Sequence, residues 1–411
     1  MVKQRTARIL VLGVSQLAAL AFHLHAAGFA LYEDGAKGNA MGGANVGKTG
    51  DASAVYANPA NMTDLPGLQT MAGVTLVNPS GHVALPTGGA DVHSEWFPPP
   101  HVYATYQTFD RWWLGMGLYS EYGLGTKYPD DWAGRYNAIE TKVETFTLNP
   151  NVAYKVTDKL SLATGVRVMY LDFYSKRALP PTIGGGTMEL DGDAWGVGYD
   201  TALSYKILDD LDFGLVYRSQ VKQPVKGTVE SKDTTNPLVF ADKQTDAEAN
   251  LTLPSSATAG LNYQALKKLN IGTALTWTEW SSYENLNIDF GETLRQVVPH
   301  SYTEKDWDNV WRMGLGADYA LTQNWSLQCG YVYDMCPINK NHADFMMPAG
   351  DRHIVGLGVG YKWSTWTVNV SYNYLVMVDN AKTVVINGVP TTTNFEDGQA
   401  HMVGLSVGKN F

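Results

Sequence analysis

Strict alternation of apolar and polar residues recurs along most of the chain. In residues 366–374 (WTVNVSYNY) every second side chain is Trp, Val or Tyr, and the residues between them are Thr, Asn and Ser. The same period of two runs through residues 195–205, 311–319 and 325–334. This period with one apolar face is typical of a β-strand that is buried on one side. Trp and Tyr end many of these stripes, as expected where strands enter and leave lipid.

The alternation divides the chain into about fourteen strands of similar length. They lie near residues 68–79, 100–109, 111–121, 142–156, 158–173, 192–207, 211–223, 247–265, 267–282, 301–320, 323–335, 352–363, 365–378 and 399–411. Short turns, such as 157–158 and 363–364, alternate with long loops, such as 80–99 and 379–398. This arrangement predicts an all-β fold, a transmembrane antiparallel β-barrel of the outer-membrane kind. A soluble β-sandwich is the alternative, but it rarely alternates short and long connections so strictly.

The first 67 residues differ from the predicted barrel, residues 68–411. Lys3, Arg5 and Arg8 precede an apolar run and then Ala26, so residues 1–26 read as a secretory signal peptide, with a membrane anchor as the alternative. No later stretch approaches the roughly 18 apolar residues that a membrane helix needs. Residues 27–67 are rich in Gly, Ala and Asn and have no strand period. They form either a plug inside the lumen, which is wide enough to hold one, or a disordered leader.

Composition and charge exclude several classes of protein. The chain has 30 Lys and Arg against 40 Asp and Glu, a net charge of −10 that argues against nucleic acid as a partner. Charged residues are 17% of the chain while Tyr numbers 23 and Trp 12, an unusual balance for a soluble surface. The two cysteines, Cys329 and Cys336, indicate no disulfide framework. No metal-ligand spacing is present, so neither a metal nor a cofactor is predicted.

Two short motifs match enzyme signatures by letter only. Residues 42–49 (GGANVGKT) fit a phosphate-binding loop, which needs a strand before it and a long helix after it, yet Pro59 follows within a dozen residues. Small residues that pack tightly in a confined lumen explain the segment better. Residues 404–408 (GLSVG) fit a nucleophile elbow, but they lie in a regular last strand, so Ser406 is expected to face the lumen. We therefore predict no catalytic residues.

The predicted fifth strand carries an apolar patch on its lumen face. Small and polar inward positions, including Arg167, give way to Met169, Leu171 and Phe173. An apolar patch inside a polar lumen needs cover, either a bound hydrophobic ligand or the plug. Arg177 follows shortly after. It either pairs with a ligand carboxylate, or is a solvated loop arginine, or contacts lipopolysaccharide.

Several segments together resemble the FadL/TodX-type transporters, which carry long-chain fatty acids and other hydrophobic compounds across Gram-negative outer membranes. The segments are AGFALYEDGAKGNAMGGANVGKTGDASAVYANPANM (27–62), SEYGLGTKY (120–128), WGVGYDTALSYKI (195–207), LVYRSQVKQPVKG (215–227), LTLP (251–254), WTEWSSYENL (277–286) and MPAGDRH (347–353). The likeness spans almost the whole chain after the signal peptide.

The resemblance implies a fourteen-stranded barrel closed by an N-terminal hatch. Hydrophobic substrate would be caught by outer loops, pass to an inner pocket and leave sideways where the third strand is kinked. The kink would hold Tyr119, Glu121, Tyr122 and Gly123, and Gly123 permits a distorted strand. The hatch would begin at Ala27 and Gly28 and shift around the triplet Asn58-Pro59-Ala60.

The resemblance also assigns substrate-binding residues. Phe29 would lie in the inner pocket, and Arg177 matches the family arginine that meets a substrate carboxylate. Thr303 stands where the family has a partner lysine, and Lys305 lies two residues on. The carboxylate partner is thus Arg177, Lys305 or neither, while Met169, Leu171 and Phe173 would contact the apolar part of the substrate.

These features together predict passive uptake of long-chain fatty acids or similar hydrophobic molecules. The protein would act as a monomer in a Gram-negative outer membrane, with its N-terminus on the periplasmic side, in contact with membrane lipid and lipopolysaccharide. The nearest alternative is the same scaffold carrying aromatic hydrocarbons. Others are an outer-membrane lipase or protease, and an open porin for polar solutes.

Overall fold

The computed structural model describes residues 28–32, 34–235, 244–291, 300–347, 349–386 and 388–411. The predicted signal peptide, residues 1–26, and Ala27 lie outside the described residues. Within the described ranges, no helix is long and apolar enough to cross a membrane.

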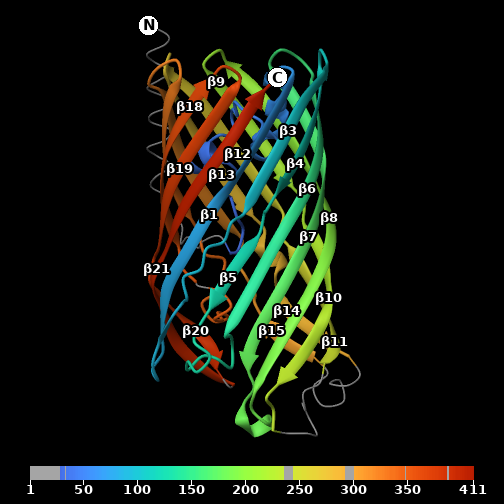
Figure 1. Cartoon of the computed structure of the whole chain (residues 1–411), viewed down its shortest axis with the longest axis vertical. Coiled ribbons are helices and arrows are strands. Elements are labelled where there is room, and N and C mark those ends of the chain that lie inside the picture. The colour runs from blue at the N-terminus through green and yellow to red at the C-terminus, as the bar shows by residue number, and fades with distance from the viewer. Residues whose placement is uncertain (1–27, 33, 236–243, 292–299, 348, 387) are drawn as a thin grey trace.

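A single antiparallel sheet closes on itself into a barrel of 14 strands, because the last strand pairs with the first (Figure 1). Nine wall strands are continuous: β1 (Leu68–Ala84), β3 (Pro100–Phe109), β6 (Glu140–Lys155), β7 (Leu160–Ala178), β8 (Thr187–Leu208), β17 (Trp325–Asp334), β18 (Arg352–Trp363), β19 (Trp366–Met377) and β21 (Val389–Asn410). Five are interrupted and carry two labels each: β4 (Trp112–Tyr119) with β5 (Gly123–Lys127), β9 (Leu211–Arg218) with β10 (Val221–Lys232), β11 (Gln244–Leu253) with β12 (Ser256–Leu266), β13 (Leu269–Thr278) with β14 (Asn285–Phe290), and β15 (His300–Glu304) with β16 (Val310–Ala320). The predicted all-β barrel is confirmed.

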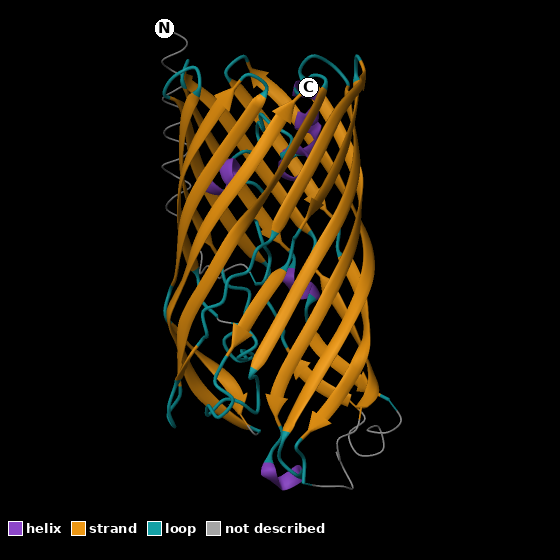
Figure 2. Cartoon of the chain, viewed as in Figure 1, coloured by secondary structure: helices purple, strands orange, loops and turns teal. Residues whose placement is uncertain are grey.

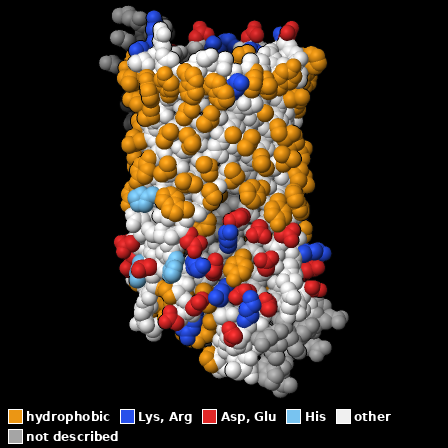
Figure 3. All heavy atoms as spheres, in the orientation of Figure 1, with side chains coloured by type: hydrophobic (Ala, Val, Ile, Leu, Met, Phe, Trp, Pro, Cys, Tyr) orange, Lys and Arg blue, Asp and Glu red, His pale blue; other side chains and the backbone are white. Residues whose placement is uncertain are grey.

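Side chains alternate between the outside of the wall and the lumen. Along β18, Val355, Leu357 and Val359 are exposed, whereas the residues between them are buried. Figure 3 shows the outward apolar side chains as a continuous belt, with the charged ones concentrated toward the end opposite the C-terminus. One group of exposed aromatic residues lies near the short turns and the C-terminus: Tyr106, Phe109, Trp112, Trp325, Trp363, Trp366 and Phe411. This belt with an aromatic border is the lipid-facing surface of an outer-membrane barrel.

The sequence prediction erred mainly beyond the belt. The predicted third strand, 111–121, ends at Tyr119 and resumes at Gly123 as β5. The predicted loops near 283–300 and 379–398 contain β14 and β20 (Asn380–Ile386), and a short β2 (Ala90–Asp91) lies in the first long loop. The last strand begins at Val389 rather than near residue 399. These hairpins extend past the apolar belt, where outward side chains no longer face lipid. Outward positions there need not be apolar, so the alternating pattern is lost from the sequence.

The described residues of the range 28–67, which we call the N-terminal segment, lie inside the barrel (Figure 2). The segment holds two short helices, α2 (Ala36–Ala40) and α3 (Ala54–Ala57), and the 3₁₀ helix η1 (Pro59–Asp64). α2 contacts β17, β18, β19 and β21, whereas η1 contacts β4, β6, β7 and β8. Most of the described residues between Gly28 and Leu65 are buried. The segment therefore crosses the lumen and packs on two sides of the wall.

Glycines of the wall let the segment's backbone approach closely. A Cβ atom on Gly272 would lie 1.8 Å from the carbonyl oxygen of Ala44, and one on Gly316 would lie 2.3 Å from that of Met41. The motif GGANVGKT thus lies against bare backbone, and the helix that follows it, α3, has only 4 residues. No long helix is available to hold a phosphate, so tight packing of small residues accounts for the motif.

Candidate functional site

The third wall strand is broken at Ser120–Tyr122. β4 pairs with β6 up to Tyr119 opposite Thr147, and β5 resumes the pairing with Gly123 opposite Glu144. Between these two pairs β6 advances by three residues, whereas the broken strand advances by four. The broken strand therefore has one extra residue, as in a β-bulge. The Thr145 hydroxyl fills the gap in the ladder: it accepts from the Tyr122 N–H at 3.0 Å and donates to the Tyr122 carbonyl at 2.8 Å. The sequence-predicted kink therefore coincides with an actual interruption.

The edge of β5 that faces away from β6 has no wall strand beside it. β3 pairs with β4 only as far as His101 opposite Tyr119, and Pro98, Pro99 and Pro100 precede that point. The N-terminal segment takes the place of a wall strand. Leu31 N–H donates to the Glu121 carbonyl at 2.8 Å, and Gly123 N–H donates to the Phe29 carbonyl at 3.0 Å. The wall at the kink is therefore completed by residues that come from inside the lumen.

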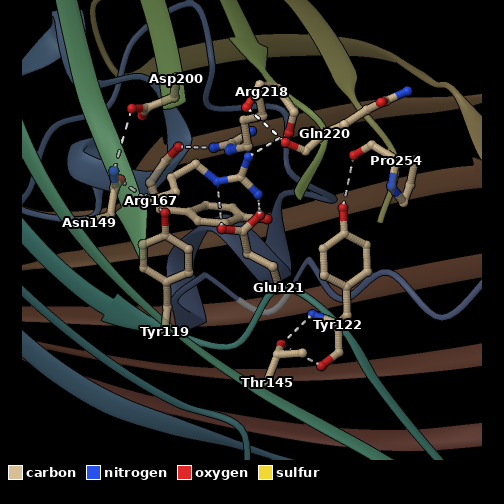
Figure 4. A network of polar contacts seen from close by, with 12 residues as sticks. Tyr119, Glu121, Tyr122, Thr145, Asn149, Arg167, Asp200, Arg218, Gln220 and Pro254 are labelled. Carbon is tan, nitrogen blue, oxygen red and sulfur yellow. Dashed lines mark hydrogen bonds and ion pairs between the residues drawn. The ribbon is translucent and has the colours of Figure 1, made fainter. Parts of the chain in front are cut away.

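A buried ion pair lies directly behind the kink (Figure 4). Arg167 of β7 donates from Nε to Glu121 Oε1 at 2.9 Å and from Nη2 to the second carboxylate oxygen. Its Nη1 donates to the Ser219 carbonyl at 2.9 Å, in the gap between β9 and β10. The two side chains are 1% and 6% exposed. Bidentate contact with both charges desolvated is among the stronger polar contacts in proteins, and it fixes the Glu121 side chain.

The two kink tyrosines also bind other strands, Tyr119 the neighbouring β6 and Tyr122 a distant one. Tyr119 donates its hydroxyl to Asn149 Oδ1 at 2.9 Å, and Tyr122 donates to the Pro254 carbonyl at 3.2 Å, in the gap between β11 and β12 (Figure 4). Strand pairing places the gaps after β9, between β11 and β12, after β13 and before β16 side by side. The kink is thus linked through side chains to a row of interruptions in other wall strands.

A cavity of about 290 Å³, which we call the lateral cavity, extends from the lumen to the kink. Lumen-facing residues such as Val332 and Ile354 line one part of it. Phe29, Ala30, Leu31, Tyr122 and Gly123 line another. Phe146 of β6, whose side chain is exposed on the outside of the wall, lines a third. The cavity therefore runs from the barrel interior to the lipid-facing surface beside the break.

Phe29 lies in an aromatic cluster at the inner end of this cavity. Its ring centroid is 4.9 Å from that of Trp280, 5.8 Å from Tyr122 and 6.0 Å from Trp307. The preceding residue must be glycine, because Gly28 has a φ of +30° and a Cβ there would lie 2.4 Å from the Trp280 ring. Gly28 also accepts a hydrogen bond from Arg352 at 2.6 Å. Phe29 is therefore held by several rings and a fixed backbone.

A second cavity of about 50 Å³, the outer cavity, lies on the other side of Phe29. It shares Phe29, Val143 and Met347 with the lateral cavity. Its other lining residues are mostly apolar or aromatic, including Phe173, Leu190, Val225, Leu251, Tyr283, Leu286, Ile288 and Trp307. Lys305 and Asp344 also line it and form an ion pair. Phe29 thus stands between two apolar cavities.

The predicted substrate-binding residues are only partly brought together. Met169 and Leu171 are fully buried in the same apolar cluster as Phe29, and Phe173 and Lys305 line the outer cavity. Arg177 lies four residues beyond Phe173 on β7 and lines neither described cavity. The structure therefore does not assemble Arg177 and Lys305 into one carboxylate site.

The predicted hatch triplet is fully enclosed. Asn58 and Ala60 are 0% exposed, and Pro59 opens η1. The Asn58 amide donates to the carbonyls of Val46 and Leu203 at 3.0 and 3.1 Å, and its Oδ1 accepts from the Ala60 N–H at 3.0 Å. One side chain thereby joins two parts of the N-terminal segment to β8.

Ser406, in the motif GLSVG, faces the lumen as predicted. Its Oγ lies 2.9 Å from His101 Nε2 and accepts the Ala36 N–H at 2.9 Å. His101 Nδ1 is buried and has no hydrogen-bond partner among the described residues. A catalytic triad needs a carboxylate at that nitrogen and access for substrate. The pair instead anchors α2 to the wall.

Tyr122 was a predicted site residue, whereas the other residues of the site were not: Arg167, Ser219, Asp344 and three rings around Phe29, those of Trp280, Tyr283 and Trp307. Arg167 alone carried a signal, as an inward-facing arginine on a strand whose other inward residues there are small. Asp344 lies in the connection between β17 and β18, which has no periodicity. Its role became visible only through the fold.

Comparison with known proteins agrees with this architecture. The long-chain fatty acid transport protein of Escherichia coli O6:H1 is 24% identical over 396 residues, which cover 85% of this chain and 86% of that protein. The crystal structure of a Pseudomonas aeruginosa FadL homologue matches with a TM-score of 0.84 and 20% identity over 94% of this chain and 100% of its own. The Pseudomonas putida toluene transporter TodX matches with a TM-score of 0.73 and 18% identity over 93% and 99%.

A family model described as outer membrane protein transport protein (OMPP1/FadL/TodX) matches residues 17–411. Members of this family are transporters rather than enzymes. Because the match covers nearly the whole chain, this protein belongs to the OMPP1/FadL/TodX family of transport proteins and resides in the Gram-negative outer membrane.

Proposed function

We propose that the protein mediates passive uptake of a long-chain fatty acid or a similar hydrophobic molecule, which leaves sideways into the bilayer at the third-strand kink. The lateral cavity is the observation that carries this proposal, because it reaches from Phe29 to the outside of the wall near Phe146. An apolar molecule gains free energy when it passes from water to an apolar lining and then to lipid, so no external energy source is needed.

Movement of Phe29 would join the two cavities. The residues that complete the wall, Phe29 to Leu31, are held to the kink by two backbone hydrogen bonds. Each such bond contributes a net of about 0.5–1.5 kcal/mol. Ligand in the outer cavity would displace Phe29, and with it the strand-like contact at Glu121 and Gly123. Substrate binding and opening of the wall would then be one event.

A reversible crosslink between the N-terminal segment and the kink tests this proposal. Ala30 and Tyr122 form an isolated antiparallel bridge, so their replacement by cysteine places two thiols opposite each other. We expect oxidation of the Ala30→Cys/Tyr122→Cys variant to abolish uptake by cells of whichever radiolabelled substrate the wild-type protein takes up, oleate or toluene, and reduction to restore it. The single-cysteine variants are the controls, since they also contain Cys329 and Cys336. Full uptake by the oxidised double variant would rule out lateral exit at the kink.

Uptake of aromatic hydrocarbons is a second candidate. It is supported by the rings around the outer cavity, since Phe29, Phe173, Tyr283 and Trp307 all line it. Edge-to-face contacts between aromatic rings are favourable beyond their buried area. Parallel uptake measurements with oleate and toluene separate the two candidates. A large steady conductance of the purified protein in planar bilayers would instead favour a porin.

A further inference from the structure

The outer cavity is lined by two opposite charges that neutralise each other. Lys305 Nζ donates to Asp344 Oδ2, and Asp344 Oδ1 accepts the Met346 N–H at 3.0 Å. The side chains of Lys305 and Asp344 are 3% and 9% exposed. The ammonium group lies 3.7 Å from Met346 Sδ and 5.7 Å from the centroid of the Tyr283 ring. Among the described residues, the other contacts of the Lys305 ammonium are with a thioether sulfur and an aromatic ring, and they include no second carboxylate.

No other charge balances the cavity among the described residues that line it. Glu248 is the third charged lining residue, but its side chain is 65% exposed and pairs with Lys226. Arg177 is not a lining residue. The Lys305–Asp344 pair therefore presents no net charge to a molecule in the outer cavity, and the other lining residues among those described add no buried charge.

The loop that supplies Asp344 is anchored at the two residues that follow it. The Phe345 N–H donates to Asn137 Oδ1 at 2.9 Å, and the Thr126 hydroxyl donates to the Met346 carbonyl at 2.8 Å. The Phe345 side chain is fully buried and packs on Trp132, with ring centroids 4.8 Å apart. Asp344 is thus part of the cavity wall rather than a mobile loop carboxylate.

A neutral wall discriminates between ligands by charge. A carboxylate that entered beside the intact pair would be desolvated without an unpaired cation to compensate it, and burying such a charge is strongly unfavourable. An alcohol, an ester or a hydrocarbon carries no such penalty. We infer that the outer cavity selects uncharged hydrophobic molecules, and that Asp344 is the residue that determines this specificity by neutralising Lys305. The inference rests on the proposed uptake function and narrows its substrate class.

The test compares two ligands of equal chain length, decanol and decanoate, on the purified full-length protein. Trp307 lines the cavity, so the part of the ligand-induced change in tryptophan fluorescence that Trp307→Phe abolishes reports occupancy. The measured quantity is the ratio of the decanoate Kd to the decanol Kd. Partitioning of the ligands into detergent affects this ratio equally in every variant, so differences between variants reflect the protein. Asp344→Asn keeps an acceptor for the Met346 N–H and leaves Lys305 as a buried cation. We expect the ratio to fall about tenfold or more, the effect of one hydrogen bond between charged groups.

Two further variants make the outcome decisive. Asp306→Asn removes one negative charge at a side chain that is 65% exposed, and it should leave the ratio unchanged. Lys305→Gln/Asp344→Asn removes both charges and should return the ratio to the wild-type value, provided that the barrel folds, as shown by its heat-modifiable mobility on gels. A ratio unaffected by Asp344→Asn, with both ligands bound, would overturn the inference. Failure of both ligands to bind any variant would count against the proposed function itself.

Discussion

At the residue scale, two buried ion pairs near the cavities each join residues that are far apart in the chain. Glu121 pairs with Arg167 behind the kink, and Lys305 pairs with Asp344 in the outer cavity. A buried pair is costly to desolvate, but a single buried charge is worse by several kcal/mol. Each pair therefore holds two separate wall or loop elements in position relative to each other. This effect matters more than the pair's net contribution to the stability of the fold.

Breaking the pair at the kink should show this asymmetry. Arg167→Met leaves the Glu121 carboxylate buried without a cation, and we expect it to destabilise the barrel by about 3–5 kcal/mol. The double variant Glu121→Gln/Arg167→Met leaves no charge and should recover most of the loss. Thermal unfolding in detergent measures both. If the single variant proved as stable as the double one, the pair would not be desolvated as the structure has it.

At the element scale, the N-terminal segment is positioned by the absence of side chains on the facing wall. Gly214, Gly272, Gly314 and Gly316 lie where a Cβ atom would come within 2.4 Å of a backbone oxygen of the segment. Backbone oxygen cannot yield in the way that the end of a flexible side chain can. These wall glycines thus form a surface against which another backbone can pack closely. The N-terminal segment, with its own small residues, packs there.

Adding one methyl group to this glycine surface should displace the N-terminal segment. In Gly272→Ala the new carbon would lie 1.8 Å from the Ala44 oxygen, so we expect a raised steady conductance in planar bilayers and greater sensitivity of cells to large antibiotics. Gly408→Ala is the matched control, because its nearest neighbour would be 3.5 Å away. If both variants kept the conductance and antibiotic sensitivity of the wild-type protein, the segment would not be what seals the lumen.

The wall was predictable from sequence in a way that the sites were not. Each strand faces lipid on one side and the lumen on the other, so its period of two is imposed locally and can be read without the fold. Gly123 likewise marked the kink. The partners were not local: Glu121 meets an arginine 46 residues away, and Lys305 meets a carboxylate 39 residues away in a loop without a pattern. Arg177 matched a family position, yet it lines neither cavity.

At the scale of the whole molecule, the kink belongs to a larger arrangement of interruptions. Arg167 connects Glu121 to the Ser219 carbonyl in the gap after β9, and Tyr122 reaches the Pro254 carbonyl in the gap after β11. Carbonyl groups freed by broken strands need other donors when they are buried. Arg167 of β7 and Tyr122 of the kink supply those donors. Displacement of the kink would therefore leave the Pro254 carbonyl without its Tyr122 donor, which opposes such a displacement.

The apolar belt determines how the whole barrel lies in the membrane. Leu357 is 58% exposed near the middle of β18, so Leu357→Arg places a charge in the hydrocarbon region and should destabilise the inserted barrel by about 2–4 kcal/mol. Val385 is 52% exposed on β20, beyond the belt, where the same substitution should change little. The folded fraction recovered in lipid vesicles, read from heat-modifiable mobility, measures both. Equal losses for the two variants would place the membrane at another height, and the lateral cavity would then no longer open toward lipid.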